Sequence, residues 1–123
     1  MAGEKKFDLE ERLIDFACQV IKFSGQVQKS YAGNHLSNQL VRSGTSPALQ
    51  YGEAQAAESR NDFIHKLKIL LKELRETKVN LKIMDRSKLV EESAQVQTII
   101  QECDQLIAIF IKSIDTARKN NSK

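Results

Sequence analysis

The amino-acid sequence predicts an all-α protein folded as an antiparallel, up-down-up-down four-helix bundle. Apolar residues recur every three or four positions in four long segments, which is the spacing of one face of an α-helix. No stretch alternates apolar and polar residues with the two-residue period of a β-strand. The segments are separated by polar connections of about 3 to 8 residues, and such short connections favour antiparallel neighbours.

The first predicted helix begins after Asp8, an N-cap residue that has Glu11 at the capping-box position. It ends at the segment KSYAGN, residues 29–34, whose Gly and Asn are typical of a helix end and a turn. The apolar arc of this helix covers about half of its circumference. Its core stripe is Leu9, Leu13, Phe16, Ala17, Val20, Phe23 and Val27, with Ile14, Cys18 and Ile21 beside it.

The second predicted helix contains Pro47, the single proline of the chain. A proline removes one backbone donor and crowds the carbonyl four residues earlier, so the helix is expected to kink there or to restart with Ser46 as its cap. The core stripe of this helix is Leu36, Leu40, Gly44, Pro47 or Ala48, Tyr51 and Ala54, and Val41 and Leu49 point away from it. A polar stripe runs beside the core stripe and consists of Gln39, Ser43, Ser46, Gln50 and Glu53.

The third predicted helix has the clearest apolar pattern. It begins near Arg60, because Ser59 is a favourable N-cap and Asp62 adds an acidic residue to the first turn. It ends around residues 84–88, MDRSK. Its core stripe is Phe63, Leu67, Leu70, Leu74, Thr77, Leu81 and Met84.

The last predicted helix starts near Lys88, with Asp85 and Ser87 as candidate caps. The polar tail RKNNSK at its end has no apolar side chain to bury. Its core stripe is Val96, Ile99, Ile100, Cys103, Leu106, Ile107, Phe110, Ile114 and Ala117.

Length and composition indicate one domain that spans residues 1–123, with an ordered core at about 7–118. Hydrophobic residues make up 41% and charged residues 28% of the chain, a balance typical of globular proteins. No run of about 18 apolar residues is present, and the N-terminus lacks the apolar region of a secretory signal, so we expect a cytoplasmic protein without membrane contact. Cys18 and Cys103 lie far apart without His or Cys at ligand spacing, so we expect no metal, cofactor or disulfide framework.

The apolar and small residues that one bundle core does not need predict self-association. A soluble monomer would expose Ile14, Val41 and Leu49, whereas contact between copies would cover them. The alternative is a wide core around the first helix that leaves Ile14 partly exposed. The predicted oligomer interface consists of Ile14, Cys18, Ile21, Val41, Ser43, Ser46, Leu49, Gln50 and Glu53.

The middle of the chain is basic. Residues 60–90 hold nine Lys or Arg against four Asp or Glu, whereas the remainder holds ten against twelve. Lys68, Lys72, Arg75 and Lys82 fall within an arc of about 80° on the third helix and form a candidate ridge for the phosphates of nucleic acid. The alternative is a solvated helix face whose charge is partly balanced by Glu73 and Glu76. Few aromatic residues accompany the ridge, which favours backbone contacts over base stacking.

The segment RSGTSPALQYGEAQAAESRNDFIHKLKILLKELRET resembles the signature region of a bacterial four-helix-bundle family, the large-subunit (23S) rRNA intervening-sequence proteins, which are S23 ribosomal protein-like. The resemblance extends from about Phe7 to Thr116. Three positions depart from the family pattern, because Gln50 replaces Asn, Leu49 replaces a small residue and Pro47 replaces an aliphatic one. The matching residues are Arg42, Ser43, Thr45, Ser46, Tyr51, Glu53, Ala54, Phe63, Leu67, Glu73, Glu76 and Thr77.

The resemblance implies a small cytosolic protein that assembles into a ring-like homo-oligomer, typically a homopentamer, with no assigned enzymatic activity. A related branch includes the accessory proteins of diversity-generating retroelements, which are similar in fold and associate with a reverse transcriptase and nucleic acid. The expected partners are therefore further copies of the chain, RNA or DNA, and a nucleic-acid enzyme.

One short motif suggests catalysis. Arg60 and His65 in RNDFIH have the Arg-x4-His spacing that resembles the motif of helical-bundle ribonucleases, in which His serves acid-base chemistry and Arg steadies phosphate charge. A surface His that follows an Arg is the simpler interpretation. No phosphate loop, nucleophile elbow or metal cluster is present in the sequence.

We therefore expect a non-enzymatic, oligomeric, nucleic-acid-associated or scaffold protein. Two alternatives remain: a protein-protein interaction module that binds no nucleic acid, and a ribonuclease that uses Arg60 and His65.

Overall fold

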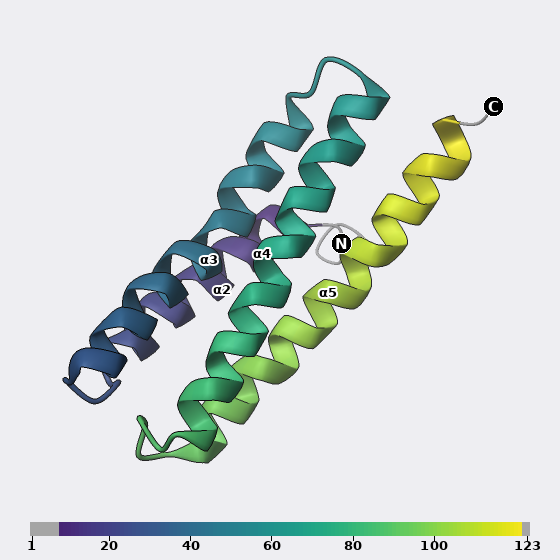
Figure 1. Ribbon diagram of the computed structural model, residues 1–123. Helices are drawn as coiled ribbons and strands as arrows, with labels where there is room; N and C mark the ends of the chain where they lie inside the picture. The colour runs from purple at the N-terminus through teal and green to yellow at the C-terminus, as the bar shows by residue number, and fades with distance from the viewer. Residues whose placement is uncertain (1–7, 122–123) are drawn as a thin grey trace.

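The computed structural model describes residues 8–121, which form four α-helices and no strand (Figure 1). Each helix packs beside the one that follows it in the chain, and the connections lie alternately at the two ends of the molecule. No helix in the described range is long and apolar enough to cross a membrane. The helices are α2 (Leu9–Ser24), α3 (Tyr31–Gln55), α4 (Arg60–Arg86) and α5 (Ser93–Asn121).

Two of the predicted helix starts are confirmed by side-chain caps. Asp8 Oδ1 accepts a hydrogen bond from the backbone N–H of Glu11 at 3.2 Å, and Ser59 Oγ accepts one from Asp62 at 3.0 Å. These caps satisfy backbone donors that have no partner inside the first turn of a helix.

The predicted turn at KSYAGN is wrong, because most of this segment belongs to the start of α3. The first helix ends earlier, at Ser24. Ser30 caps α3, and its Oγ accepts the N–H of Gly33 at 3.0 Å. A Cβ on Gly33 would lie 1.9 Å from the carbonyl oxygen of Gln28, so the glycine allows the chain to pass closely there rather than ending a helix.

Pro47 lies inside α3 and is buried, and the helix continues through it from Tyr31 to Gln55. Of the two alternatives from the sequence, a restart capped by Ser46 is wrong. A proline inside a helix costs one hydrogen bond and some crowding, and burial of Pro47 and of the neighbouring core stripe offsets that cost.

The last helix starts at Ser93 and not near Lys88. Ser87 is the C-cap of α4, and Lys88 adopts a left-handed φ of 58°, which cannot continue a helix. Asp85 and Ser87 therefore belong to the end of α4. Leu89 in this connection is buried, and its carbonyl accepts the N–H of Gln28 at 2.8 Å, which ties two connections together at one end of the bundle.

The core stripes predicted for all four helices meet in one buried cluster. α2 approaches α3 closely, since a Cβ on Gly44 would lie 2.7 Å from Val20 Cγ1. α2 and α5 meet much less extensively, and Arg12 crosses between them to Glu102, with Nε 2.8 Å from Oε2. The hydrogen bond with Glu102 raises the pKa of Arg12. The largest fully buried side chains are Phe16, Phe23, Phe110, Leu13, Leu40, Leu67, Leu70, Leu74, Leu81, Met84, Ile99 and Leu106.

Candidate functional site

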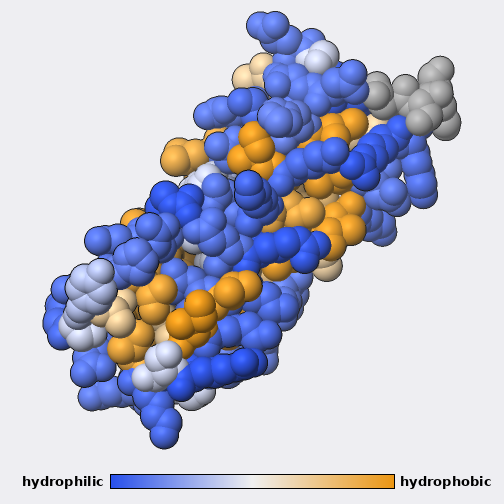
Figure 2. All heavy atoms as spheres, viewed as in Figure 1, coloured by the Kyte–Doolittle hydropathy of each residue, from blue (hydrophilic) through white to orange (hydrophobic). Residues whose placement is uncertain are grey.

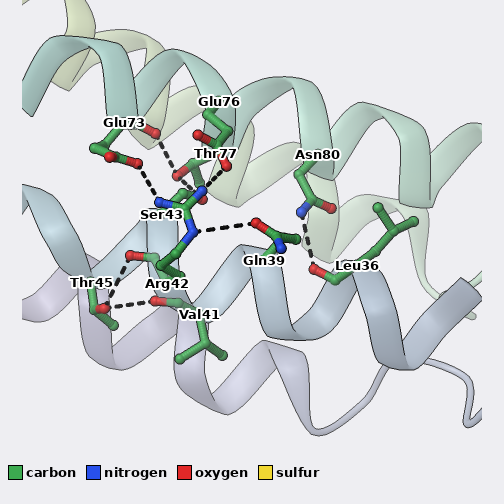
Figure 3. Close-up of polar contacts among 10 residues, drawn as sticks. All are labelled: Leu36, Gln39, Val41, Arg42, Ser43, Thr45, Glu73, Glu76, Thr77 and Asn80. Atoms are coloured by element: carbon green, nitrogen blue, oxygen red, sulfur yellow. Dashed lines mark hydrogen bonds and ion pairs between the residues drawn. The ribbon is translucent and has the colours of Figure 1, made fainter. Parts of the chain in front are cut away.

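Arg42 joins α3 to α4 through two carboxylates (Figure 3). Its Nη1 lies 3.1 Å from Oε1 of Glu73, its Nη2 bonds Glu76, and its Nε donates to Gln39 at 3.3 Å. An Arg fork that engages two carboxylates holds the helices in one register. Because Arg42 is about half exposed, water screens these pairs and their contribution to stability is small.

The contact between α3 and α4, which we call the seam, also contains a buried pair of hydroxyl groups close to Arg42. Thr77 Oγ1 lies 2.8 Å from Ser43 Oγ and 2.8 Å from the carbonyl oxygen of Glu73. Ser43 and Thr77 are fully buried within one chain. The structure therefore removes Ser43 from the predicted oligomer interface, because its hydroxyl is already used between α3 and α4.

The rest of the polar stripe on α3 also faces α4. Glu53 pairs with Lys66, with Oε1 2.9 Å from Nζ, and this contact raises the pKa of Lys66. Gln50 and Ser46 are half-buried, and Gln50 Oε1 has no hydrogen-bond partner within residues 8–121. Gln50 Oε1 therefore adds no hydrogen bond to the seam within the described residues. Sequence periodicity located this stripe but could not identify the helix that it contacts.

The basic ridge of α4, which we define as Lys68, Lys72, Arg75 and Lys82, is exposed along its whole length. None of the four makes an ion pair with the described part of the chain. The expected local balance by Glu73 and Glu76 is wrong, because both carboxylates turn to Arg42 on α3. The ridge therefore presents uncompensated positive charge.

A groove between α4 and α5 extends this positive surface. Lys68 lines it from α4, and Lys112, Arg118 and one acidic residue, Asp115, line it from α5. Its lining also includes the apolar residues Leu71 and Ile114. The volume of the groove is about 510 Å³. Sequence reasoning missed this groove, because the cations of α5 lie far along the chain from the basic segment 60–90. We call it the α4–α5 groove.

A second groove lies between α3 and α4, and it is more apolar than the first. Val79 and Ile83 of α4 are 56% and 44% exposed, and they line this groove with Leu36 of α3. Asn80 lies in its floor, where Nδ2 donates to the Leu36 carbonyl at 3.0 Å and Oδ1 has no partner within residues 8–121. Figure 2 shows apolar atoms at the surface near the start of α3 and the end of α4, at the lower left of the view. We call it the α3–α4 groove, and sequence reasoning missed it.

The predicted apolar surface of α2 is present. Ile14 and Ile21 are 38% and 52% exposed, and Cys18 between them is exposed. The three residues form one line on the helix, the α2 stripe. On α3, Leu49 is 68% exposed and Val41 is half-buried. The α2 stripe and Leu49 are thus partly exposed to solvent in the described structure of the single chain.

The residues of the seam between α3 and α4, Arg42, Ser43, Glu73, Glu76 and Thr77, are among those that carry the family resemblance. The family described as 23S rRNA-intervening sequence protein matches residues 5–112. The chain belongs to this family.

A solved structure supports the assignment to the intervening sequence proteins. It is a protein of unknown function from the S23 ribosomal protein family of Bacteroides thetaiotaomicron VPI-5482. The two chains are 30% identical, with a TM-score of 0.78, and the similarity covers 85% of this chain and 96% of that one. No curated protein matches this chain.

In this intervening sequence protein, Arg60 and His65 are both exposed on α4. Five positions on an α-helix correspond to about 140° of rotation, so the two side chains project in different directions. Arg60 lines two open hollows with Phe63, and neither of them includes His65. Residues 8–121 contain no group of three or more His, Cys, Asp or Glu that could hold a metal ion.

Proposed function

We propose that this chain is an up-down-up-down bundle that self-assembles into a ring, a homopentamer, and binds the backbone of RNA or DNA in the bacterial cytoplasm without catalysing a reaction. The observation that carries the nucleic-acid part is the uncompensated ridge of α4. Four cations project from one helix, and Glu76, the carboxylate one turn from Lys72, is held by Arg42 together with Glu73.

Phosphate binding follows from this charge distribution. When a Lys or Arg neutralises a phosphate, counterions are released from the nucleic acid. This release strengthens binding, and the affinity gained in this way falls steeply as the salt concentration rises. The α4–α5 groove adds Lys112 and Arg118 beside Lys68, so the positive surface spans two helices. A ring would repeat this surface around its symmetry axis and strengthen the attraction. The ridge is made of Lys and Arg without aromatic residues, so it is suited to phosphate contacts rather than to base stacking.

Self-assembly is supported by the exposed aliphatic side chains. Ile14, Ile21 and Leu49 present apolar surface on α2 and α3 that contact between copies would remove from water. An interaction module for another protein, such as a nucleic-acid enzyme, is the second candidate, and the apolar α3–α4 groove favours it.

The experiment is a gel shift with duplex DNA and with structured RNA, at low and moderate salt. The ridge variant carries Lys68→Gln, Lys72→Gln and Lys82→Gln. The control removes the same charge from three cations that are paired within the chain, Lys66→Gln, Lys78→Gln and Lys119→Gln. We expect the ridge variant to bind at least about tenfold more weakly and to lose about one unit of salt slope for each phosphate contact removed.

The control should remain closer to the wild type than the ridge variant. Equal losses in the two variants would show that only net charge matters and would contradict a defined ridge. A wild type that binds neither nucleic acid would leave the protein-interaction module as the function.

A further inference from the structure

Two of the exposed apolar faces within residues 8–121 lie on different sides of α3. α2 packs against α3 on one side and carries the α2 stripe, whereas α4 packs on the other and forms the α3–α4 groove (Figure 1). We infer that the α2 stripe of one copy docks in the α3–α4 groove of a neighbouring copy. This inference rests on the proposed self-assembly and names the two surfaces that meet.

The spacing of the apolar groups suits a helix that lies in a groove. Ile14, Cys18 and Ile21 follow i, i+4 and i+7 spacing, which places three side chains in line over about 10 Å of helix. Val79 and Ile83 are one turn apart on α4, and Leu36 supplies the opposite wall from α3. The α2 stripe therefore presents a ridge of aliphatic side chains, and the groove presents an apolar trough.

The charges beside the two faces are complementary. Glu11 and Asp15 lie beside the α2 stripe with a single cation, Lys22, and none of these three exposed side chains makes an ion pair within residues 8–121. Arg75 and Glu76 line the α3–α4 groove, and since Glu76 is paired with Arg42, the charge of the lining that lacks an ion pair in the described range is that of Arg75. Docking would bring these groups of opposite charge together at the rim of the contact. Arg75 would then serve the contact between copies, and Lys68, Lys72 and Lys82 would remain for phosphate.

The floor of the groove supplies a separate observation. Asn80 is 6% exposed and its Oδ1 lacks a hydrogen-bond partner within the described chain, so the groove in a single copy leaves a polar atom unsatisfied. The competing seat for the stripe is the α4–α5 groove, which is rimmed by cations but offers one exposed aliphatic side chain, Ile111, where the α3–α4 groove offers Val79 and Ile83.

Because the two faces differ, the contact is heterologous. Each copy uses its stripe on one neighbour and its groove on the other, and such contacts continue until a ring closes. This geometry makes a prediction that a symmetric dimer contact does not make. If one variant loses its stripe and another loses its groove, the intact groove of the first can still bind the intact stripe of the second.

The experiment measures solution mass by light scattering for the full chain. The stripe variant carries Ile14→Glu and Ile21→Glu, and the groove variant carries Val79→Glu and Ile83→Glu. All four side chains are partly exposed in the single chain, so folding should be retained, and circular dichroism checks this. The control is Ile111→Glu in the α4–α5 groove, which adds the same carboxylate at a similarly exposed position.

We expect the wild type and the control to be oligomers of equal mass, and each double variant alone to be a monomer. An equimolar mixture of the two variants should give a dimer with one copy of each and nothing larger, because the remaining faces are both destroyed. An oligomer that survives either double variant would overturn this inference while leaving self-assembly intact. So would dissociation by Ile111→Glu alone, or a mixture that stays monomeric. A monomeric wild type would overturn the proposed self-assembly as well.

Discussion

Ser43 and Thr77, both fully buried, place their hydroxyl oxygens 2.8 Å apart in the seam between α3 and α4. The two residues are 34 positions apart in the chain, and both belong to the resemblance with the intervening sequence proteins. Thr77 also contacts the carbonyl oxygen of Glu73. Ser43, in contrast, has no side-chain partner other than Thr77 among residues 8–121.

This asymmetry predicts unequal effects of removing each hydroxyl. Thr77→Val keeps the shape of the side chain but leaves the buried Ser43 hydroxyl without its side-chain partner, so we expect a loss of about 1–3 kcal/mol in the free energy of unfolding. Ser43→Ala leaves Thr77 bonded to the Glu73 carbonyl and should cost about 1 kcal/mol or less. Urea unfolding measures both. A larger loss for Ser43→Ala than for Thr77→Val would contradict the assignment of partners.

Two glycines of α3 predict opposite effects of the same substitution. A Cβ at Gly44 would lie 2.7 Å from Val20 Cγ1, and Val20 is fully buried, so Gly44→Ala should destabilise the fold by about 1–3 kcal/mol. A Cβ at Gly52 would meet nothing within 4 Å. Gly52→Ala should therefore stabilise the helix by up to about 1 kcal/mol. Thermal unfolding of the two variants measures the difference, and a shift of the same sign in both would contradict the close approach of α2 and α3.

The fold class and most helix starts followed from the sequence because they depend on local signals. The Ser59 cap and the apolar stripes are set by residues three or four positions apart, which is the range over which one helix organises itself. The wrong turn at Gly33 and the wrong helix start after Ser87 arose because Gly and Ser each occur in two structural roles. Whether a Gly ends a helix or allows a close approach depends on what lies opposite, and this is a tertiary property.

The surfaces were harder to predict than the core. The cations of the ridge could be placed on one face by their spacing, but the partners of Glu73 and Glu76 could not. Glu76 lies one turn from the ridge residue Lys72 in the sequence, and Arg42 reaches both carboxylates from another helix. The exposed Val79 and Ile83 also gave no signal, because the stripe of α4 already contained enough apolar residues to fill the core.

The buried thiol of Cys103 predicts a pH-dependent resistance to alkylation. Burial raises the pKa of Cys103 from 9.0 to about 12, and its Sγ lies 3.2 Å from the carbonyl oxygen of Leu74. Only the thiolate is the nucleophile. In a Cys18→Ser variant, iodoacetamide at pH 8 to 9 should therefore modify the native chain far more slowly than the chain in urea. Equal rates in the two states would contradict this burial.

The same pKa change sets the direction of a stability effect. The folded value lies above the unfolded value of 9.0, so the contribution of the neutral thiol is fully present below about pH 9 and is lost as the pH rises toward 12. The Cys18→Ser chain should lose more stability over this range than a chain that carries both Cys18→Ser and Cys103→Ala. Urea unfolding at pH 8, 9 and 10 compares the two. Parallel pH dependence would show that Cys103 is not responsible.

Arg42 links the seam to the ridge, and this link predicts a loss of nucleic-acid affinity without removal of a ridge cation. In Arg42→Gln, Glu73 and Glu76 lose their partner, and Glu76 becomes able to pair with Lys72, which lies one turn earlier on α4. Stability should fall by about 1 kcal/mol or less, because the pairs are exposed to water. Gel-shift affinity at low salt should fall several-fold.

Arg42→Gln combined with Glu73→Gln and Glu76→Gln removes the released carboxylates and should recover binding to at least the wild-type level. If affinity stays low in the triple variant, Arg42 contacts the phosphates directly, and the carboxylates do not control the ridge.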